Sequence, residues 1–152
     1  MAQDKAIVAA VRTTPETVIE DYARVMELAG YKEALDPTKQ TILKNNISWH
    51  LLYPSANSTP WQVEGVAKTL KEGGFDDLVV VENRTVVTKA KKGEHLNNFT
   101  GVHEKYGLPV KYNFNPHDMR WVTYEPKGEM LVLDKVFPKG IRIPDYFFDR
   151  NV

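Results

Sequence analysis

Polar and charged side chains follow two apolar runs of the sequence: Lys44 and Asn46 follow one run, and Glu82 and Arg84 follow a later one. Lys44 supplies a positive charge, and the planar guanidinium of Arg84 suits bidentate pairing with phosphate or carboxylate. Asn46 can donate and accept hydrogen bonds, and Glu82 can act as a general base. These residue types predict a site for a small anionic ligand. The three charged side chains also fit a structural set of ion pairs, which is the open alternative.

A helix start between the two groups offers a further element for binding an anion. Thr59 fits an N-cap, Pro60 the first helical position, and Gln62 the capping-box position. The unpaired N–H groups of a helix N-terminus suit phosphate or carboxylate, so Thr59 joins Asn46 and Arg84 as a predicted ligand-binding residue. Lys44 and Glu82 are the predicted catalytic residues. His50 is a third candidate, for proton transfer, because it follows the same apolar run as Lys44.

Three apolar runs are predicted to form the strands that position these groups. They are residues 6–11, residues 41–43 continuing toward 49, and residues 78–81. Continuous runs of this kind fit strands buried on both faces of a parallel sheet. Ligands of open parallel sheets bind beyond the carboxyl ends of the strands, where the loops that follow residues 41–49 and 78–81 should meet.

Two amphipathic helices are predicted between these strands. Residues 18–29 carry an apolar stripe after a cap at Thr14, and residues 60–72 carry another before Gly73 and Gly74. The alternation of strands and helices predicts an α/β fold with a mostly parallel sheet and flanking helices, of the flavodoxin-like or Rossmann-like kind.

The second half of the chain is less regular. Residues 98–106 are predicted to form a helix and residues 110–114 a strand. Residues 120–124 and 130–133 are predicted to pair as a hairpin, whereas Pro144 should interrupt any regular element there. The lysine-rich residues 89–92 are predicted to form a solvated loop, with a phosphate-binding patch as the alternative.

Composition excludes several function classes. The 152 residues suit one domain, and 20 basic residues balance 20 acidic ones, which argues against nucleic acid as the main partner. The absence of cysteine excludes disulfides and iron–sulfur ligation within the chain. The four histidines lack a metal-binding spacing, so no metal site is predicted and all but His50 are expected on the surface or in loops. No apolar run reaches the ~18 residues of a membrane span, and residues 1–5 lack a secretory pattern, so we expect a soluble, cytoplasmic protein.

Residues 43–47, Leu-Lys-Asn-Asn-Ile, resemble the strand end Leu/Ile-Lys-Pro-Asn-Leu of domain-of-unknown-function family 362. The Thr-Pro helix start at residues 59–66, the strand closing on an acidic residue at 73–82, and residues 11–18 also resemble this family. By position, Lys44 and Asn46 match the Lys-x-Asn feature and Glu82 matches the acidic strand end. Asn45 replaces the usual proline, and Arg84 has no counterpart.

The resemblance implies that the chain is the N-terminal part of a longer protein, so that its site could be incomplete. It also implies that an iron–sulfur cluster would belong only to a ferredoxin-like partner or to a further domain. Two functions stay open: an enzyme domain, or half of one, that holds a small anion, and a non-catalytic interaction domain that docks a redox (iron–sulfur) partner or a missing C-terminal half. The aromatic residues 146–148 motivate the second, which predicts an exposed apolar patch and self-association.

Overall fold

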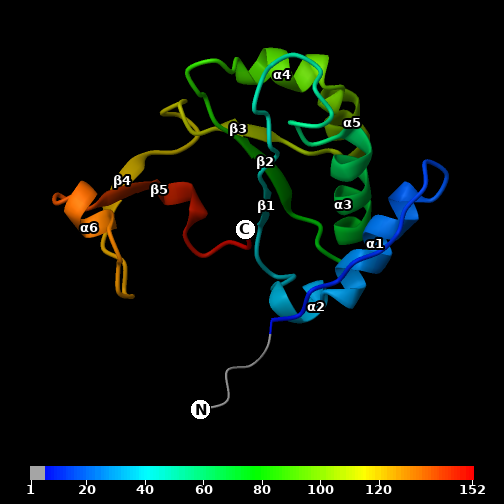
Figure 1. The fold of residues 1–152 in the computed structure, drawn as a ribbon, viewed down its shortest axis with the longest axis horizontal. Coiled ribbons are helices and arrows are strands. Elements are labelled where there is room, and N and C mark those ends of the chain that lie inside the picture. The colour runs from blue at the N-terminus through cyan, green and yellow to red at the C-terminus, as the bar shows by residue number, and fades with distance from the viewer. Residues whose placement is uncertain (1–5) are drawn as a thin grey trace.

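The computed structural model describes residues 6–152, so the interpretation of residues 1–5 lies outside it. A three-stranded parallel sheet lies beside a separate antiparallel strand pair (Figure 1). The strands β1 (Thr41–Leu43), β2 (Leu78–Glu82) and β3 (Val110–Tyr112) follow the order β1-β2-β3. The predicted α/β class with a mostly parallel sheet is confirmed.

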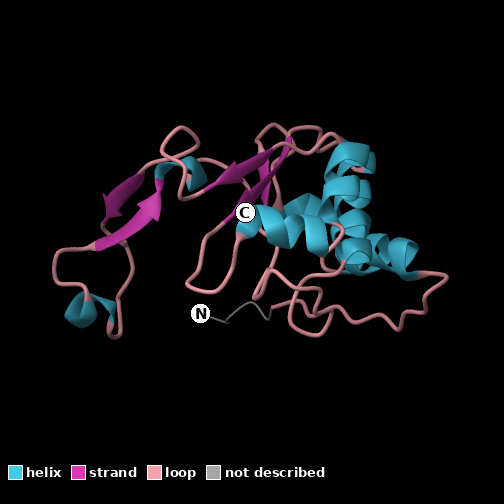
Figure 2. Cartoon of the chain, turned by 90° about the horizontal axis from the view of Figure 1, so that it is seen from above, coloured by secondary structure: helices cyan, strands magenta, loops and turns pink. Residues whose placement is uncertain are grey.

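Helices connect the strands and cover one face of the sheet (Figure 2). The chain between β1 and β2 forms α3 (Pro60–Glu72), and the chain between β2 and β3 forms α4 (Ala90–Leu96) and α5 (Phe99–Tyr106). α1 (Val18–Leu28) packs against α3 and precedes the short α2 (Tyr31–Ala34). No helix within residues 6–152 is long and apolar enough to cross a membrane.

The two helices predicted from their amphipathic stripes are both present. Thr59 is the N-cap of α3, Pro60 opens the helix, and Gly73 ends it. α1 begins later than predicted, with Thr17 as N-cap, because the Thr17 hydroxyl accepts the Thr14 N–H and donates to Asp21.

The approach of α1 to α3 depends on Gly65. A Cβ atom added to Gly65 would lie 2.7 Å from the Tyr22 side chain. Glycine is therefore required at this helix contact, since any larger residue would push α1 away from α3.

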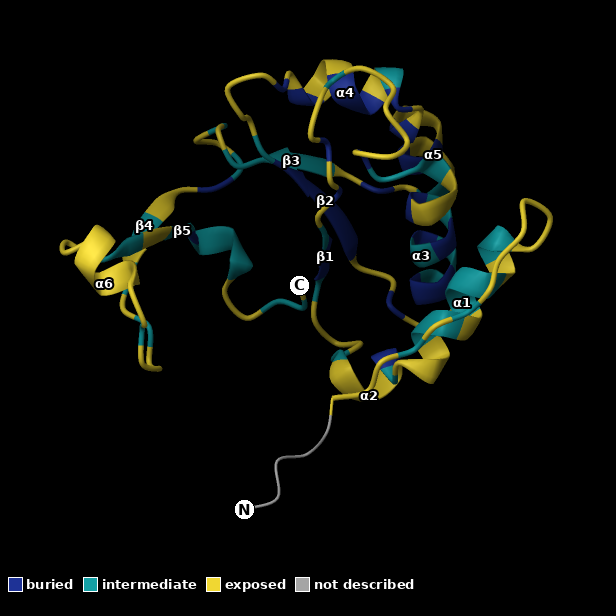
Figure 3. Cartoon of the chain, viewed as in Figure 1, coloured by how far each residue is buried: buried dark blue, intermediate teal, exposed yellow. Residues whose placement is uncertain are grey.

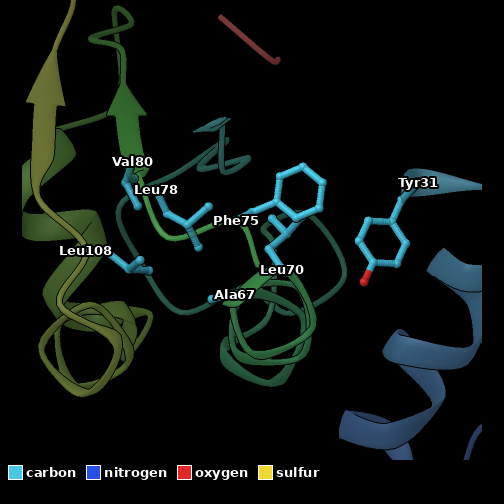
Figure 4. Close-up of a cluster of buried hydrophobic side chains, with 7 residues drawn as sticks. All are labelled: Tyr31, Ala67, Leu70, Phe75, Leu78, Val80 and Leu108. Carbon is cyan, nitrogen blue, oxygen red and sulfur yellow. The ribbon is translucent and has the colours of Figure 1, made fainter. Parts of the chain in front are cut away.

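Alternating residues of β2 build two cores. On the helix side, Leu78 and Val80 pack with residues of α3 and with Phe75 and Leu108 (Figure 4). On the other side, Val79 and Val81 belong to a cluster that also contains Ile42 and Met119, with Tyr146 and Phe147 packed against it. β2 is buried along its whole length (Figure 3), as predicted for residues 78–81.

The predicted strand over residues 6–11 is wrong. Ile7 and Val8 are 72% and 89% exposed, and the segment pairs with no strand in the described residues. The edge of β1 is bridged instead by Asn151, whose carbonyl accepts the Ile42 N–H. Half of residues 6–11 are alanines, which offer little apolar area for burial.

The segment between β2 and β3 is more helical than predicted. Residues 89–92 lead into α4 rather than forming a loop, although Lys91 and Lys92 are exposed as expected. The helix predicted at residues 98–106 and the strand predicted from residue 110 are confirmed as α5 and β3. His103 on α5 is buried, which contradicts the expectation of a surface histidine.

The predicted hairpin partner of residues 120–124 is also wrong. β4 (Trp121–Tyr124) pairs antiparallel with β5 (Ile141–Pro144), while residues 130–133 lead into α6 (Leu133–Val136). Pro144 is tolerated because it ends β5, opposite Trp121. An antiparallel pair in the second half is thus present with a different second strand, and Figures 1 and 2 show it standing apart from the parallel sheet together with α6.

Candidate functional site

A row of polar residues crosses the carboxyl end of the parallel sheet. Glu82 and Tyr112 are register partners in β2 and β3, and Asn45 lies two residues beyond the end of β1. Because side chains alternate between the faces of a strand, Glu82 and Tyr112 share the helix-covered face with Val80, two residues earlier in β2. This polar row of Asn45, Glu82 and Tyr112 is the centre of the candidate site.

Glu82 supplies the carboxyl group of this row, and it is deeply buried. It is 1% exposed, and its Oε1 has no hydrogen-bond partner within residues 6–152. Burial raises the pKa of Glu82 to about 8, against the opposing effects of the Lys44 charge and the Asn45 side chain. The nearby Glu94 carboxylate also contributes to this rise in the pKa of Glu82. Glu82 is therefore mostly protonated at pH 7 and presents a hydrogen-bond donor.

Asn45 adds a second donor beside Glu82. The residue is buried, and its Nδ2 is also without a hydrogen-bond partner in the described part of the chain. Buried polar groups are rarely left unpaired, because each lost hydrogen bond costs about 1–3 kcal/mol. The amide of Asn45 and the carboxyl of Glu82 therefore each keep a polar atom that makes no hydrogen bond within the described residues.

A second buried carboxyl group borders the row. Glu94 on α4 accepts a hydrogen bond of 3.1 Å from the Tyr112 hydroxyl, and burial raises the pKa of Glu94. Burial, followed by the nearby Glu94 charge, also raises the pKa of Tyr112. The Lys91 ammonium lies 5.4 Å from the centre of the Tyr112 ring. Sequence reasoning missed both Glu94 and Tyr112.

Lys44 lies close to this row, as predicted. It lines a cavity of about 180 Å³ between β1 and α3, together with Asn45, Ser58 and Gln62. Its ammonium donates to the Asn45 carbonyl, and its charge lowers the pKa of Glu82. The structure therefore brings together Lys44 and Glu82, two of the three predicted catalytic residues.

Asn46 and Thr59 make hydrogen bonds in and beside the loop at residues 46–58 and do not line this cavity. The Asn46 amide donates to the Ala56 carbonyl at 2.7 Å, and the Asn46 N–H donates to the Ser58 hydroxyl. The Thr59 side chain makes no capping hydrogen bond, and the backbone carbonyl of Thr59 accepts the Gln62 N–H. Neither residue lines the Lys44 cavity, so the ligand-binding role of Asn46 and Thr59 stays a prediction.

His50, in the same loop, contacts the segment that follows β2. His50 Nδ1 lies 3.1 Å from the Val87 carbonyl oxygen, in the segment that follows β2. The buried Asn57 organises the loop by accepting the Ser48 N–H and donating to Asn97 of the segment after α4. Asn57 is a structural residue that the sequence did not single out.

Arg84 lies in a different place from Lys44. It is exposed, with its guanidinium 5.5 Å from the centre of the Phe114 ring. It lines a separate cavity of about 600 Å³ with Trp121 and two further arginines. Arg84 is thus separated from the Lys44 cavity, and Asn46 and Thr59 line neither of these two cavities.

The fold and site define an α/β protein with a protonated buried carboxyl group and a cation at the carboxyl end of a parallel sheet. No family model, no curated protein and no solved structure matches the chain. Within residues 6–152, no three His, Asp or Glu side chains gather as a metal ion would require. The function of the protein must therefore be inferred from the geometry of the polar row.

Proposed function

We propose that the protein binds a small oxyanion at the carboxyl end of the sheet. The observation that carries this proposal is a pair of buried polar atoms without a hydrogen-bond partner in the described residues, Asn45 Nδ2 and Glu82 Oε1, beside the charge of Lys44. Lys44 would neutralise the ligand, and Asn45 would donate a hydrogen bond to it. Glu82 would act as a general acid below its pKa and as a general base above it.

The size of the cavity limits the ligand. Its volume of about 180 Å³ is below the roughly 300–1,000 Å³ of ordinary ligand pockets. Inorganic phosphate or a short carboxylate fits this space better than a larger metabolite. Catalysis would also require the ligand to reach Glu82. Enzymatic activity at this site is therefore a separate, second part of the proposal.

Inorganic phosphate is expected to raise the melting temperature of the protein, and Lys44→Ala is expected to abolish the rise. At a phosphate concentration of 100 times Kd, binding adds about 2.7 kcal/mol to the free energy of unfolding. Glu82→Gln keeps a neutral donor and should retain binding. Thermal unfolding with and without phosphate measures all three proteins.

Lys39→Ala is the matched control, because Lys39 is an exposed lysine outside the cavity. The rise in melting temperature should also fade as the pH passes about 8, where Glu82 loses its proton. An equal loss of phosphate response in Lys39→Ala and Lys44→Ala would reduce the effect to net charge and contradict the proposal.

The finer fold assignment and the family resemblance belong to the same proposal. Helical crossovers between parallel strands support a flavodoxin-like or Rossmann-like fold. Lys44 and Glu82, at two adjacent strand ends, support the resemblance to domain-of-unknown-function family 362. The resemblance implies a ferredoxin-like partner that would carry any iron–sulfur cluster.

Self-association is a second candidate function, favoured by an exposed apolar segment around α6. Tyr146 and Phe147, which belong to the aromatic tail that motivated this idea, pack against the sheet instead. Five of the exposed large apolar side chains lie close together in sequence at residues 131–137: Leu131, Val132, Leu133, Val136 and Phe137. Patches of this kind mark interaction surfaces.

A second copy of the chain suits this α6 patch, because the charges around it are of both signs. Three exposed acidic residues and three exposed lysines flank or interrupt the apolar residues: Glu125, Glu129, Asp134, Lys127, Lys135 and Lys139. In a two-fold contact each patch meets its own copy, so the acidic side chains of one copy can face the lysines of the other.

The chain is expected to dimerise with rising concentration, and Val136→Asp is expected to keep it monomeric. A buried charge at the centre of the patch would oppose association by several kcal/mol. Sedimentation equilibrium measures the mass over a wide concentration range. Val86→Asp, at a fully exposed valine after β2, should leave dimerisation unchanged. A wild-type protein that stays monomeric at every concentration would rule this function out.

A further inference from the structure

A second cavity, of about 600 Å³, lies where the loops after β2 and β3 meet the β4–β5 pair. Figure 1 shows the chain after β3 running from the parallel sheet to β4. Three arginines line this arginine pocket, namely Arg84, Arg120 and Arg142, and no aspartate or glutamate does. The volume lies within the range of ordinary small-molecule sites.

The charges of the arginine pocket are poorly compensated. Arg120 pairs with Asp145, with Nε 3.5 Å from Oδ2, and Asp145 is the one carboxylate within 4 Å of these arginines in the described residues. Arg142 donates one N–H to the Trp121 carbonyl at 2.6 Å, and its other N–H groups remain available to a ligand. Two positive charges are thus in excess, and an anion would relieve their repulsion.

Two partly exposed aromatic rings stand among the arginines. Phe114 and Trp121 are 40% and 41% exposed. The Trp121 indole N–H donates to the Asn113 carbonyl at 2.7 Å, which fixes the ring, and the Arg84 guanidinium lies over Phe114. Nucleic-acid bases stack favourably on aromatic side chains of this kind.

We propose that the arginine pocket binds a nucleoside phosphate, with its base against Phe114 or Trp121 and its phosphate held by the arginines. A guanidinium presents parallel N–H donors that match phosphate oxygens. The pocket combines this donor set with a flat apolar surface, so it recognises the two parts of one small ligand. This proposal does not depend on the oxyanion site, because Lys44 and the arginine pocket line separate cavities.

Adenosine monophosphate, adenosine and inorganic phosphate serve as probes in calorimetric titrations of the Lys44→Ala variant, in which the proposed oxyanion site no longer binds phosphate. The nucleotide should bind at least tenfold more tightly than either part alone. Arg84→Ala should weaken nucleotide binding by tenfold or more, and Arg84→Lys by less. Trp121→Phe should keep an aromatic surface for binding but remove the quenching of tryptophan fluorescence that the nucleotide causes.

Two controls separate this site from the alternatives. Arg24→Ala removes an exposed arginine of α1 and should change nothing. Lys44→Ala should remove only the phosphate response, whereas Arg84→Ala should remove only the nucleotide response. Equal affinity for adenosine and its monophosphate, or unchanged nucleotide binding by Arg84→Ala, would overturn the proposal. Much tighter binding of a single-stranded oligonucleotide would overturn it in favour of nucleic acid.

Discussion

Between pH 5 and pH 9, the Glu82→Gln variant is expected to gain about 4 kcal/mol of stability relative to the wild type. The pKa of Glu82 is raised from 4.5 to about 8 in the folded protein. The folded state therefore holds a proton that the unfolded state releases above pH 4.5. Its stabilising effect is complete below that pH and is lost as the pH rises toward 8. Glutamine stays neutral at every pH and removes this loss.

Urea unfolding at a series of pH values measures the difference between the two proteins. Glu104→Gln is the matched control, because Glu104 is an exposed glutamate on α5. The control should follow the wild type across the whole range. Parallel stability curves for Glu82→Gln and the wild type would show that Glu82 titrates normally, and the general-acid role would fall with that result.

Phe99→Ala is expected to lower the free energy of unfolding by about 3–5 kcal/mol. Phe99 is fully buried and forms a cluster with Ile47, Val63 and Val102. Removing its ring would leave a cavity between α5, α3 and the loop after β1, because close-packed neighbours relax only in part. The urea midpoint, at unchanged slope, measures the loss.

Val86→Ala provides the comparison, since Val86 is fully exposed after β2 and should change stability by no more than about 0.5 kcal/mol. Phe99→Ala should also weaken phosphate binding, because Ile47 anchors the loop that carries Ser58 to the Lys44 cavity. Similar losses of stability in the two variants would contradict the packing described for Phe99.

Elements with strong local signals could be predicted from the sequence. α3 follows from Thr59, Pro60 and the glycine pair that ends it, since these residues act on their own backbone. β2 follows from an unbroken run of β-branched residues that no helix stripe matches. These signals are local, so the rest of the chain does not alter them.

Predictions that required a distant partner failed. Residues 6–11 and 130–133 have the apolarity of strands, but apolarity does not specify which strand lies beside them. The edge of β1 is bridged by Asn151, and β4 pairs with β5, so both predicted positions are filled from elsewhere in the sequence. Residues 131–133 meet no apolar surface and stay exposed.

The candidate site divides in the same way. Lys44 and Glu82 could be predicted to lie together, because both follow strands that become neighbours in a parallel sheet. Glu94 could not, because the lysines before it suggested a loop rather than α4. Arg84 could be predicted as a candidate ligand-binding residue, but its neighbours Arg120 and Arg142 lie at the strand pair whose second strand was misassigned.

The bridge made by Asn151 has a consequence for the order of folding. Its side chain donates to Thr41, 110 residues earlier, and to the carbonyl of Asp36. Closing so long a loop costs more entropy than joining the neighbouring strands β1, β2 and β3, whose crossovers are short. We therefore expect the parallel sheet to assemble first and the Asn151 contact to form after it. A contact made after the folding barrier slows unfolding without speeding folding, so Asn151 is expected to contribute mainly to the lifetime of the folded state.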